Sequence, residues 1–189
     1  MTVADNKTDF TPEDLLRLPH AVDYELVGGQ LVGRHLGSES SAISLAIASV
    51  LRAFVKPRGA GHLFTTDCGY QCFADDPRKV RKPDVSFVRT GRLPNDRPPK
   101  GYVQIPPDLA VEVLSPGDTA DEVDAKVAEY LAAGVKLVWV VSPTVQTVRI
   151  HRPANAALGP IGLATGSEAV SGEDVLPEFE CPVSEFFNI

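Results

Sequence analysis

The sequence predicts a single domain of the α/β or α+β class. Its 189 residues suit one domain built around one core. Strand-like runs occur before, between and after two long helical patterns, as expected when helices pack on a sheet. The run 109–114 is apolar on both faces, which is typical of a central strand covered by helices. The sequence contains no internal repeat.

The first segment to show a pattern begins at residue 11. Residues 1–10 are expected to form a disordered tail, and the domain is expected to span 11–189. Thr11 is followed by proline and two acids, which predicts a helix N-terminus that ends by Pro19. Two short alternating runs flank Gly28-Gly29 and predict a β-hairpin over 24–32.

The remaining elements follow from apolar spacing and from turn residues. Helical spacing over 38–54 predicts the first long helix. Thr119 and Glu122 have the spacing of a capping box and predict a second long helix that ends at Gly134. Strands are expected at 62–66, 70–73, 84–88, 109–114, 137–141 and 145–151, with a last short one before a closing turn near Phe186. Proline-rich or Ala/Gly/Pro-rich loops are expected at 92–107 and 153–166.

Composition limits the class of protein. Three cysteines match neither a disulfide framework nor a zinc ribbon, and no signal peptide or long apolar run is recognisable, so a soluble cytoplasmic protein is expected. The four histidines lack the i, i+4 spacing of a zinc helix. No serine has a histidine at a spacing typical of a serine hydrolase.

The charge is unevenly distributed. The chain has 18 Lys+Arg against 25 Asp+Glu, a net charge of −7, but residues 78–100 carry eight of the basic residues and a local balance of +6. This segment surrounds Asp84 and could attract a phosphate backbone to one face, with strongly salt-dependent binding. The alternative is a solvated loop with incidental charge.

Two carboxylates lie where a solvated acid is not expected. Asp84 begins a strand, and Glu112 interrupts an apolar strand, where an ionised group is costly unless it is paired or bound to metal. If these strands are neighbours, the two acids form a site for a hard divalent cation. Alternatively, Asp84 is satisfied by backbone amides, and Glu112 pairs with Arg81 or Lys82.

Helical geometry places a lysine near these acids. Lys126 flanks the buried stripe of the second long helix, so its stem can follow the sheet and bring its ammonium to the carboxylates. An acid pair, a metal ion and a lysine are the components of a phosphodiester hydrolysis site. The alternative is a solvated Lys126 paired with Glu122.

These segments resemble those of a known family. The matching residues are 24–29, 82–88, 107–116, Lys126, Tyr130, 134–135, 139–141 and 176–179. Taken together, they are similar to the bacterial Uma-type family of restriction endonucleases, in the PD-(D/E)xK nuclease superfamily, over roughly residues 11–189. The resemblance implies a mixed four- or five-stranded sheet flanked by helices, often in a homodimer.

The resemblance also implies roles for four residues. Asp84 and Glu112 would be ligands of Mg²⁺ or Mn²⁺. Leu114 stands where the superfamily usually has its lysine, and Lys126, from the following helix, would take that role. Glu25 matches an early glutamate of the family and would complete the site as a third acid or through a bridging water.

Three functions are compared on this basis. The first is a metal-dependent endonuclease that hydrolyses DNA phosphodiester bonds. The second is a catalytically silent nuclease-fold module that binds nucleic acid or a partner protein, which the leucine at position 114 and the acidic net charge favour. A small-molecule hydrolase has no support beyond the versatility of folds.

Overall fold

The centre of the molecule is a six-stranded mixed sheet. The computed structural model describes residues 9–35 and 37–189. The strands lie in the order β3-β4-β5-β6-β7-β8, and only β5 and β6 are parallel neighbours. Their bounds are β3 Gly61–Thr65, β4 Val85–Arg89, β5 Leu109–Val113, β6 Leu137–Ser142, β7 Thr147–His151 and β8 Ile161–Thr165. The predicted class is confirmed, with more strands than the four or five that the resemblance implies.

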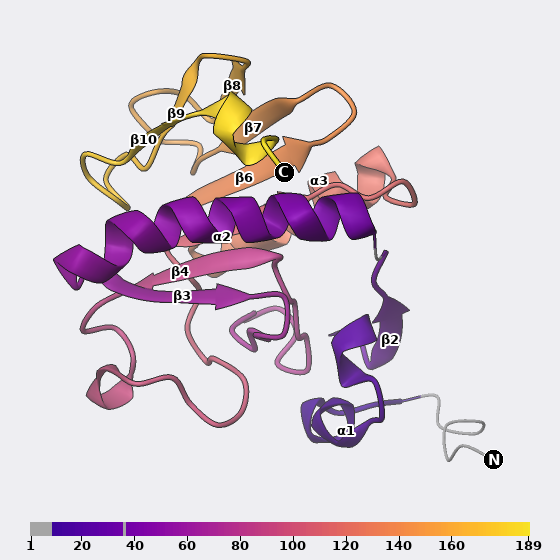
Figure 1. The fold of residues 1–189 in the computed structure, drawn as a ribbon. Coiled ribbons are helices and arrows are strands. Elements are labelled where there is room, and N and C mark those ends of the chain that lie inside the picture. The colour runs from indigo at the N-terminus through magenta and orange to yellow at the C-terminus, as the bar shows by residue number, and fades with distance from the viewer. Residues whose placement is uncertain (1–8, 36) are drawn as a thin grey trace.

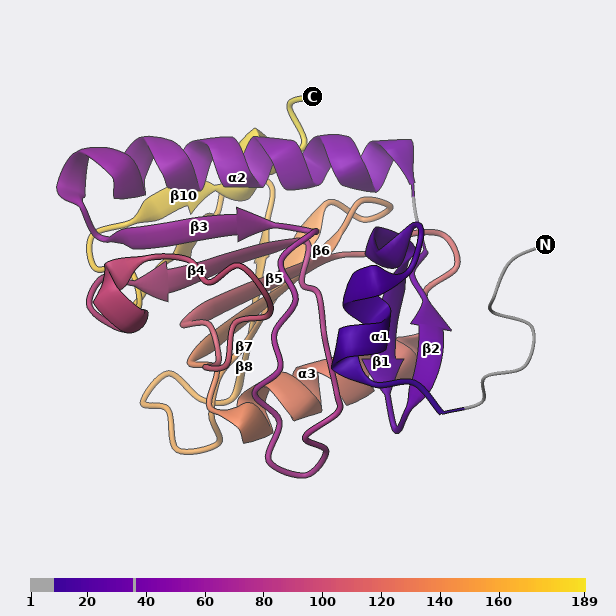
Figure 2. The ribbon, with the colours of Figure 1, turned by 90° about the horizontal axis from the view of Figure 1, so that it is seen from below.

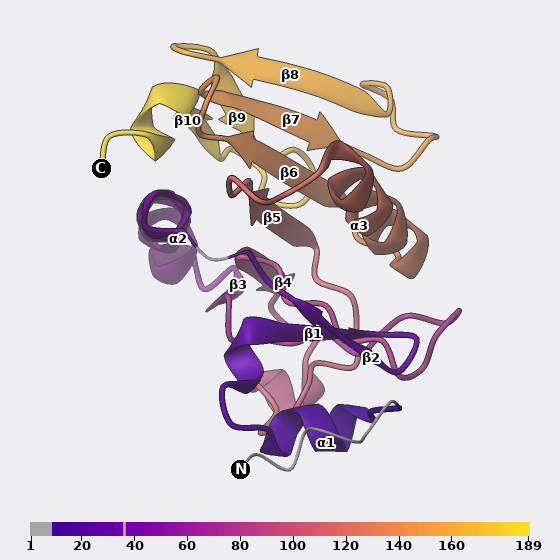
Figure 3. The same cartoon turned by 90° about the vertical axis from the view of Figure 1, so that its right-hand side faces the viewer.

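Two long helices cover opposite faces of this sheet (Figure 3). The helix α2, Ser38–Arg58, crosses one face (Figure 1), and α3, Ala120–Ala133, connects β5 to β6 across the other. Because α3 joins two adjacent parallel strands, it is the crossover of a βαβ unit. It packs over β5 and β6, and its Tyr130 contacts Glu112 of β5.

Local signals account for the helix ends. Thr119 and Glu122 form the predicted capping box of α3, and Gly134 ends that helix in the left-handed region with φ of 99°. The short helix α1, Pro12–Arg17, has a similar capping box between Thr11 and Asp14. The helix α2 is one turn longer than predicted and ends at Gly59.

The core has two layers, one on each side of the sheet. Residues Leu109, Val111 and Val113 of β5 face α2, whose Ile43, Ile47, Leu51 and Val55 are buried against them and the strands beside them. Ala110 and Glu112 point the other way, toward Val123, Val127 and Tyr130 of α3. By length and composition, α2 could cross a membrane. Its apolar stripe is instead used to cover the sheet.

Smaller elements close the ends of the structure. The predicted hairpin is formed by β1, Tyr24–Val27, and β2, Gln30–Gly33, around Gly28 and Gly29, both at positive φ. Together with α1, it lies beside one end of the central sheet (Figure 2). A second pair joins β9, Ala169–Ser171, to β10, Glu180–Pro182. The 3-10 turns are η1 Ala21–Asp23, η2 Pro94–Asp96 and η3 Val183–Phe186.

Three sequence-based expectations need correction. Residues 70–73 do not form a strand, because Tyr70 makes only isolated bridges to Arg81 and Val103. The loop expected over 153–166 contains β8, whose pattern is weak because it is an edge strand with exposed side chains. The expected tail extends too far, since Phe10 is buried and its N–H donates to the Gly29 carbonyl; residues 1–8 lie outside the described part.

Candidate functional site

Strand register places Asp84 across from Glu112. The strands β4 and β5 are antiparallel, with Val85 opposite Val111, so the position just before β4 faces position 112. The N–H of Val113 donates to Oδ2 of Asp84 at a distance of 2.8 Å. This side-chain hydrogen bond continues the β4–β5 pairing beyond the last backbone pair. Opposed residues of an antiparallel pair share a face. The two acids are therefore neighbours, as predicted.

Asp84 is held from two sides. Its Oδ2 accepts the Val113 N–H, and its Oδ1 accepts Nη2 of Arg34 at 2.9 Å. Burial raises the pKa of Asp84, and the Val113 N–H and the charge of Arg34 only partly oppose this. The alternative of backbone-amide contacts is thus correct for one oxygen, while the other oxygen pairs with a cation.

Glu112 is buried beneath α3. Its Oε1 accepts the hydroxyl of Tyr130 at 2.7 Å, and Nζ of Lys126 lies 3.6 Å from its Oε2. Burial raises the pKa of Glu112 to about 7, although Lys126 lowers it; the charges of Asp84 and Glu25 raise it further. Without a bound metal ion, this carboxyl titrates near neutral pH.

The alternative partners for Glu112 are wrong. Arg81 pairs instead with Glu25 and Glu129, and Nζ of Lys82 donates to the carbonyl of Ala21.

Lys126 faces the acids rather than solvent. Its ammonium lies 3.4 Å from Oε2 of Glu25 and 3.6 Å from Oε2 of Glu112. The charge of Glu112 is the main cause that raises the pKa of Lys126, so this amine is held in its charged form. The expected alternative partner, Glu122, is instead occupied by the capping box with Thr119.

Glu25 is the most buried acid of the site, with only 1% of its surface exposed. In an alternating hairpin a polar side chain is expected on the outer face, but Glu25 is covered by Arg81, Lys126 and the backbone of Lys82. Burial raises the pKa of Glu25, but Lys126, Arg81 and the N–H of Lys82 together lower it below its usual value. Glu25 is therefore an ionised anchor for two cations.

Sequence reasoning missed Arg34, and it considered Arg81 only as a partner of Glu112. Arg34 follows β2 and contacts Asp84, and Arg81 donates to Glu25 at 2.9 Å and to Glu129 at 2.7 Å. Neither residue lies in a periodic pattern. The sequence signal for Arg81 was its position in a basic run, three residues before Asp84.

The basic segment 78–100 is largely neutralised within the fold. Four of its cations are ion-paired, and Arg89 donates to the carbonyls of Asp174 and Val175. The four are Arg78, Lys79, Arg81 and Arg92. Arg97 and Lys100 are exposed and have no ion pair within residues 9–35 and 37–189. The segment is therefore neither a free basic face nor a simple solvated loop.

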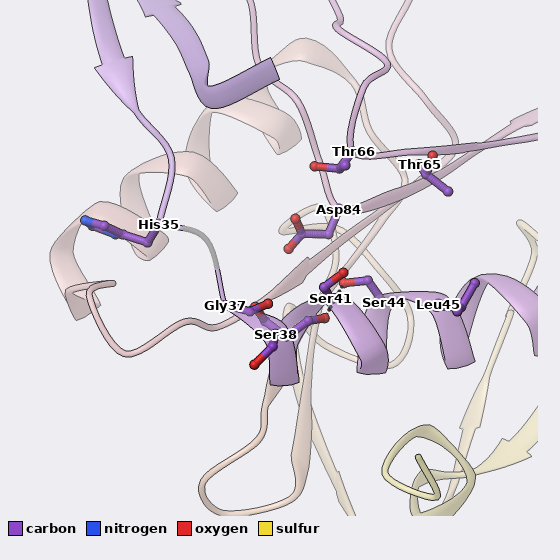
Figure 4. Close-up of a pocket in the computed structure, with 10 residues that line it drawn as sticks. His35, Gly37, Ser38, Ser41, Ser44, Leu45, Thr65, Thr66 and Asp84 are labelled. Carbon is purple, nitrogen blue, oxygen red and sulfur yellow. Dashed lines mark hydrogen bonds between the residues drawn. The ribbon is translucent and has the colours of Figure 1, made fainter. Parts of the chain in front are cut away.

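The cluster opens on two cavities. One, of about 170 Å³, is lined by Glu25, Arg34, Arg81 and Lys126 together with residues of β2 and α3. The other, of about 570 Å³, contains Asp84 (Figure 4). Its other polar lining residues are His35 and six residues with hydroxyl groups near the N-terminus of α2 and at the end of β3, namely Ser38, Ser40, Ser41, Ser44, Thr65 and Thr66. Hydroxyls and a helix N-terminus are compatible with an anionic ligand.

The donor set fits a magnesium-type ion. Mg²⁺ binds through one or two carboxylates and keeps several waters, which two opposed carboxylates beside a cavity allow. The cations of Arg34 and Lys126 already stand at Asp84 and Glu112, and both acids have raised pKa values. Within the described ranges, no group of three or more His, Cys, Asp or Glu is arranged to hold a metal ion. The site thus offers two carboxylates and not a full set of protein ligands for a metal ion.

Comparisons with known proteins agree with this fold. A family model described as "Uma2: Putative restriction endonuclease" matches residues 12–184. A crystal structure from Anabaena variabilis ATCC 29413, of "a putative nuclease belonging to DUF820", has a TM-score of 0.73 and 23% sequence identity, and the match covers 94% of this chain and 97% of that one. No curated protein matches the sequence.

The structural likeness establishes a shared fold, and the family match extends over most of the chain. The family match points, at a coarse level, to a nuclease of the restriction-endonuclease type. This protein belongs to the Uma2 family of restriction-endonuclease-like proteins.

Proposed function

We propose that this protein is a Mg²⁺- or Mn²⁺-dependent endonuclease that hydrolyses DNA phosphodiester bonds. The observation that carries the proposal is the opposed pair of Asp84 and Glu112 with the Lys126 ammonium 3.6 Å from Glu112. Asp84 and Glu112 would hold the ion. A bound divalent ion polarises the phosphate and lowers the pKa of a coordinated water.

Lys126 would act on the reacting phosphate or on the attacking water. Its positive charge can offset the negative charge that develops in the transition state. Glu25 keeps this ammonium charged and in position, because it lies 3.4 Å away and is itself fixed by Arg81 and by the backbone of Lys82. Glu25 thus assists through Lys126 rather than as a third metal ligand.

The competing function is a silent nuclease-fold module that binds nucleic acid or a partner protein. Leu114 in place of the usual lysine favoured it in the sequence. The structure offers a replacement, since the Lys126 side chain is mostly buried between two acids and its charge is therefore not a solvated one. Because this ammonium lies beside the acid that would hold the ion, we favour the enzyme.

The acid pair provides the first test. Asp84→Asn and Glu112→Gln each should reduce nicking of supercoiled plasmid in Mg²⁺ or Mn²⁺ by at least about 100-fold and weaken Mn²⁺ binding in calorimetry. The control is Asp124→Asn, an exposed acid on α3. Intact plasmid with the wild-type protein and both ions would favour the silent module.

Lys126 provides the second test. Lys126→Met should lower the single-turnover cleavage rate by about 100-fold while Mn²⁺ still binds, because the lysine acts on the reacting group and not on the ion. Lys136→Met removes an exposed lysine after the same helix and should leave the rate unchanged. Loss of Mn²⁺ binding in Lys126→Met would show that the lysine supports the acids instead.

The pH dependence of stability tests the environment of Glu112. Its folded pKa of about 7 lies above the ordinary 4.5, so the metal-free folded state holds a proton that the unfolded state releases. The contribution of Glu112 to the free energy of unfolding is greatest below about pH 4.5, and it is lost as the pH rises to about 7. When unfolding is measured with urea in EDTA, the free energy of unfolding should fall less over this pH range for Glu112→Gln than for the wild-type protein. The exposed Glu39→Gln should behave as wild type, and equal declines in all three would contradict the assignment.

The proposal includes a cytoplasmic homodimer. Three free cysteines fit a reducing compartment. The edge strand β8 exposes 65% of Ile161 and 62% of Leu163, and its outer edge pairs with no strand of the described chain. Exposed apolar edge strands favour self-association. Sedimentation equilibrium should give twice the mass of the chain, whereas a single-chain mass at micromolar concentration would contradict the dimer.

A further inference from the structure

Arg34 links the acid pair to the larger cavity. Its side chain is 7% exposed, with Nη2 2.9 Å from Oδ1 of Asp84. Its Nη1 donates to the hydroxyl and, at 3.4 Å, to the carbonyl of Thr66. Arg34 itself lines the smaller cavity, while both of its partners line the larger one (Figure 4). The guanidinium thus lies between the two spaces that meet at the site.

The contact with Arg34 occupies an oxygen that a metal ion needs. Asp84 gives Oδ2 to the Val113 N–H and Oδ1 to the guanidinium. A guanidinium and a divalent cation both bind carboxylate lone pairs. Arg34 therefore competes with an ion at Asp84 in the free protein.

The charge balance of the cluster points the same way. Four acids, Glu25, Asp84, Glu112 and Glu129, contact the three cations Arg34, Arg81 and Lys126, which leaves one negative charge among the groups in direct contact. A divalent ion added to this group leaves an excess of one positive charge in a partly buried cluster, which is unfavourable at low dielectric. A phosphate that arrives with the ion, and that attracts one of the cations, removes this excess.

Arg34 is the cation best placed to leave. Arg81 and Lys126 each contact two carboxylates, whereas Arg34 contacts only Asp84 and otherwise neutral groups of Thr66. Among the residues that the structure describes, the larger cavity beside it is lined by hydroxyls, by His35 and by no acid other than Asp84. A guanidinium binds phosphate through paired hydrogen bonds, so an incoming phosphate offers it an equivalent partner.

We propose that Arg34 is a phosphate-binding residue that the free protein holds on Asp84. When DNA binds, Arg34 moves to a backbone phosphate, and Asp84 becomes free to hold the metal ion. The inference rests on the proposed nuclease function and deepens it. Its consequence is positive coupling: DNA increases the affinity for the ion, and the ion increases the affinity for DNA by the same factor.

The test measures binding and needs no cleavage. Arg34→Gln should bind Mn²⁺ about tenfold more tightly than wild type in calorimetry at pH 8 without DNA, because one charge-assisted competitor is gone. In EDTA, it should bind a fluorescent random-sequence duplex more weakly, and its slope of log affinity against log salt should fall by about one.

Two further variants keep the result interpretable. Arg152→Gln is the matched control, since Arg152 is 8% exposed and pairs with Glu173 at 2.6 Å beyond the opposite end of the strands. It should change neither affinity. Arg34→Lys keeps the charge and should retain the wild-type salt slope. This variant would also show whether a loss in Arg34→Gln comes from charge and not from misfolding.

The outcomes separate this inference from the function on which it rests. The inference fails, and the proposed function stands, if the wild-type protein binds Mn²⁺ and nicks plasmid while Arg34→Gln binds Mn²⁺ no more tightly than the wild type. An unchanged salt slope in Arg34→Gln also overturns it. Wild-type protein that neither binds Mn²⁺ nor nicks plasmid overturns both proposals.

Discussion

The structure of the site depends on the burial of three carboxylates at one place. The β4–β5 register sets Asp84 opposite Glu112, and β1 adds Glu25 beside them. Buried like charges raise one another's pKa and destabilise the folded state unless cations or hydrogen bonds compensate. Arg34, Arg81, Lys126 and the Tyr130 hydroxyl supply this compensation, and each of them contacts one or two of the acids.

The βαβ unit explains how the compensating groups arrive. The helix α3 returns over β5, so its inward face carries Lys126 and Tyr130, one turn apart, directly above Glu112. The hairpin β1–β2 closes the same end of the sheet and brings Glu25 and Arg34 from a distant part of the chain. The site is therefore a product of three separate elements that meet at the end of β5.

The charge pattern takes on a different meaning in the folded chain. The basic run around Asp84 is mostly used to neutralise buried or nearby acids, with Arg97 and Lys100 left exposed. The chain as a whole has a net charge of −7, so its overall charge does not attract a phosphate backbone. Recognition of a phosphate must then rely on groups inside the cavities, which is the role that we assign to Arg34.

The sequence by itself determined the helices, most strands and the identity of the unusual acids. Capping boxes at Thr11 and Thr119, glycine turns and a glutamate within an apolar strand are local signals that act over two to four residues. Only the tertiary structure decided the burial of Glu25, the partners of Lys126, the contacts of Arg34 and Arg81, and the presence of β8. Arg34 and Asp84 are 50 residues apart. Such a pair has no periodic signature, because topology and not spacing along the chain brings its members together.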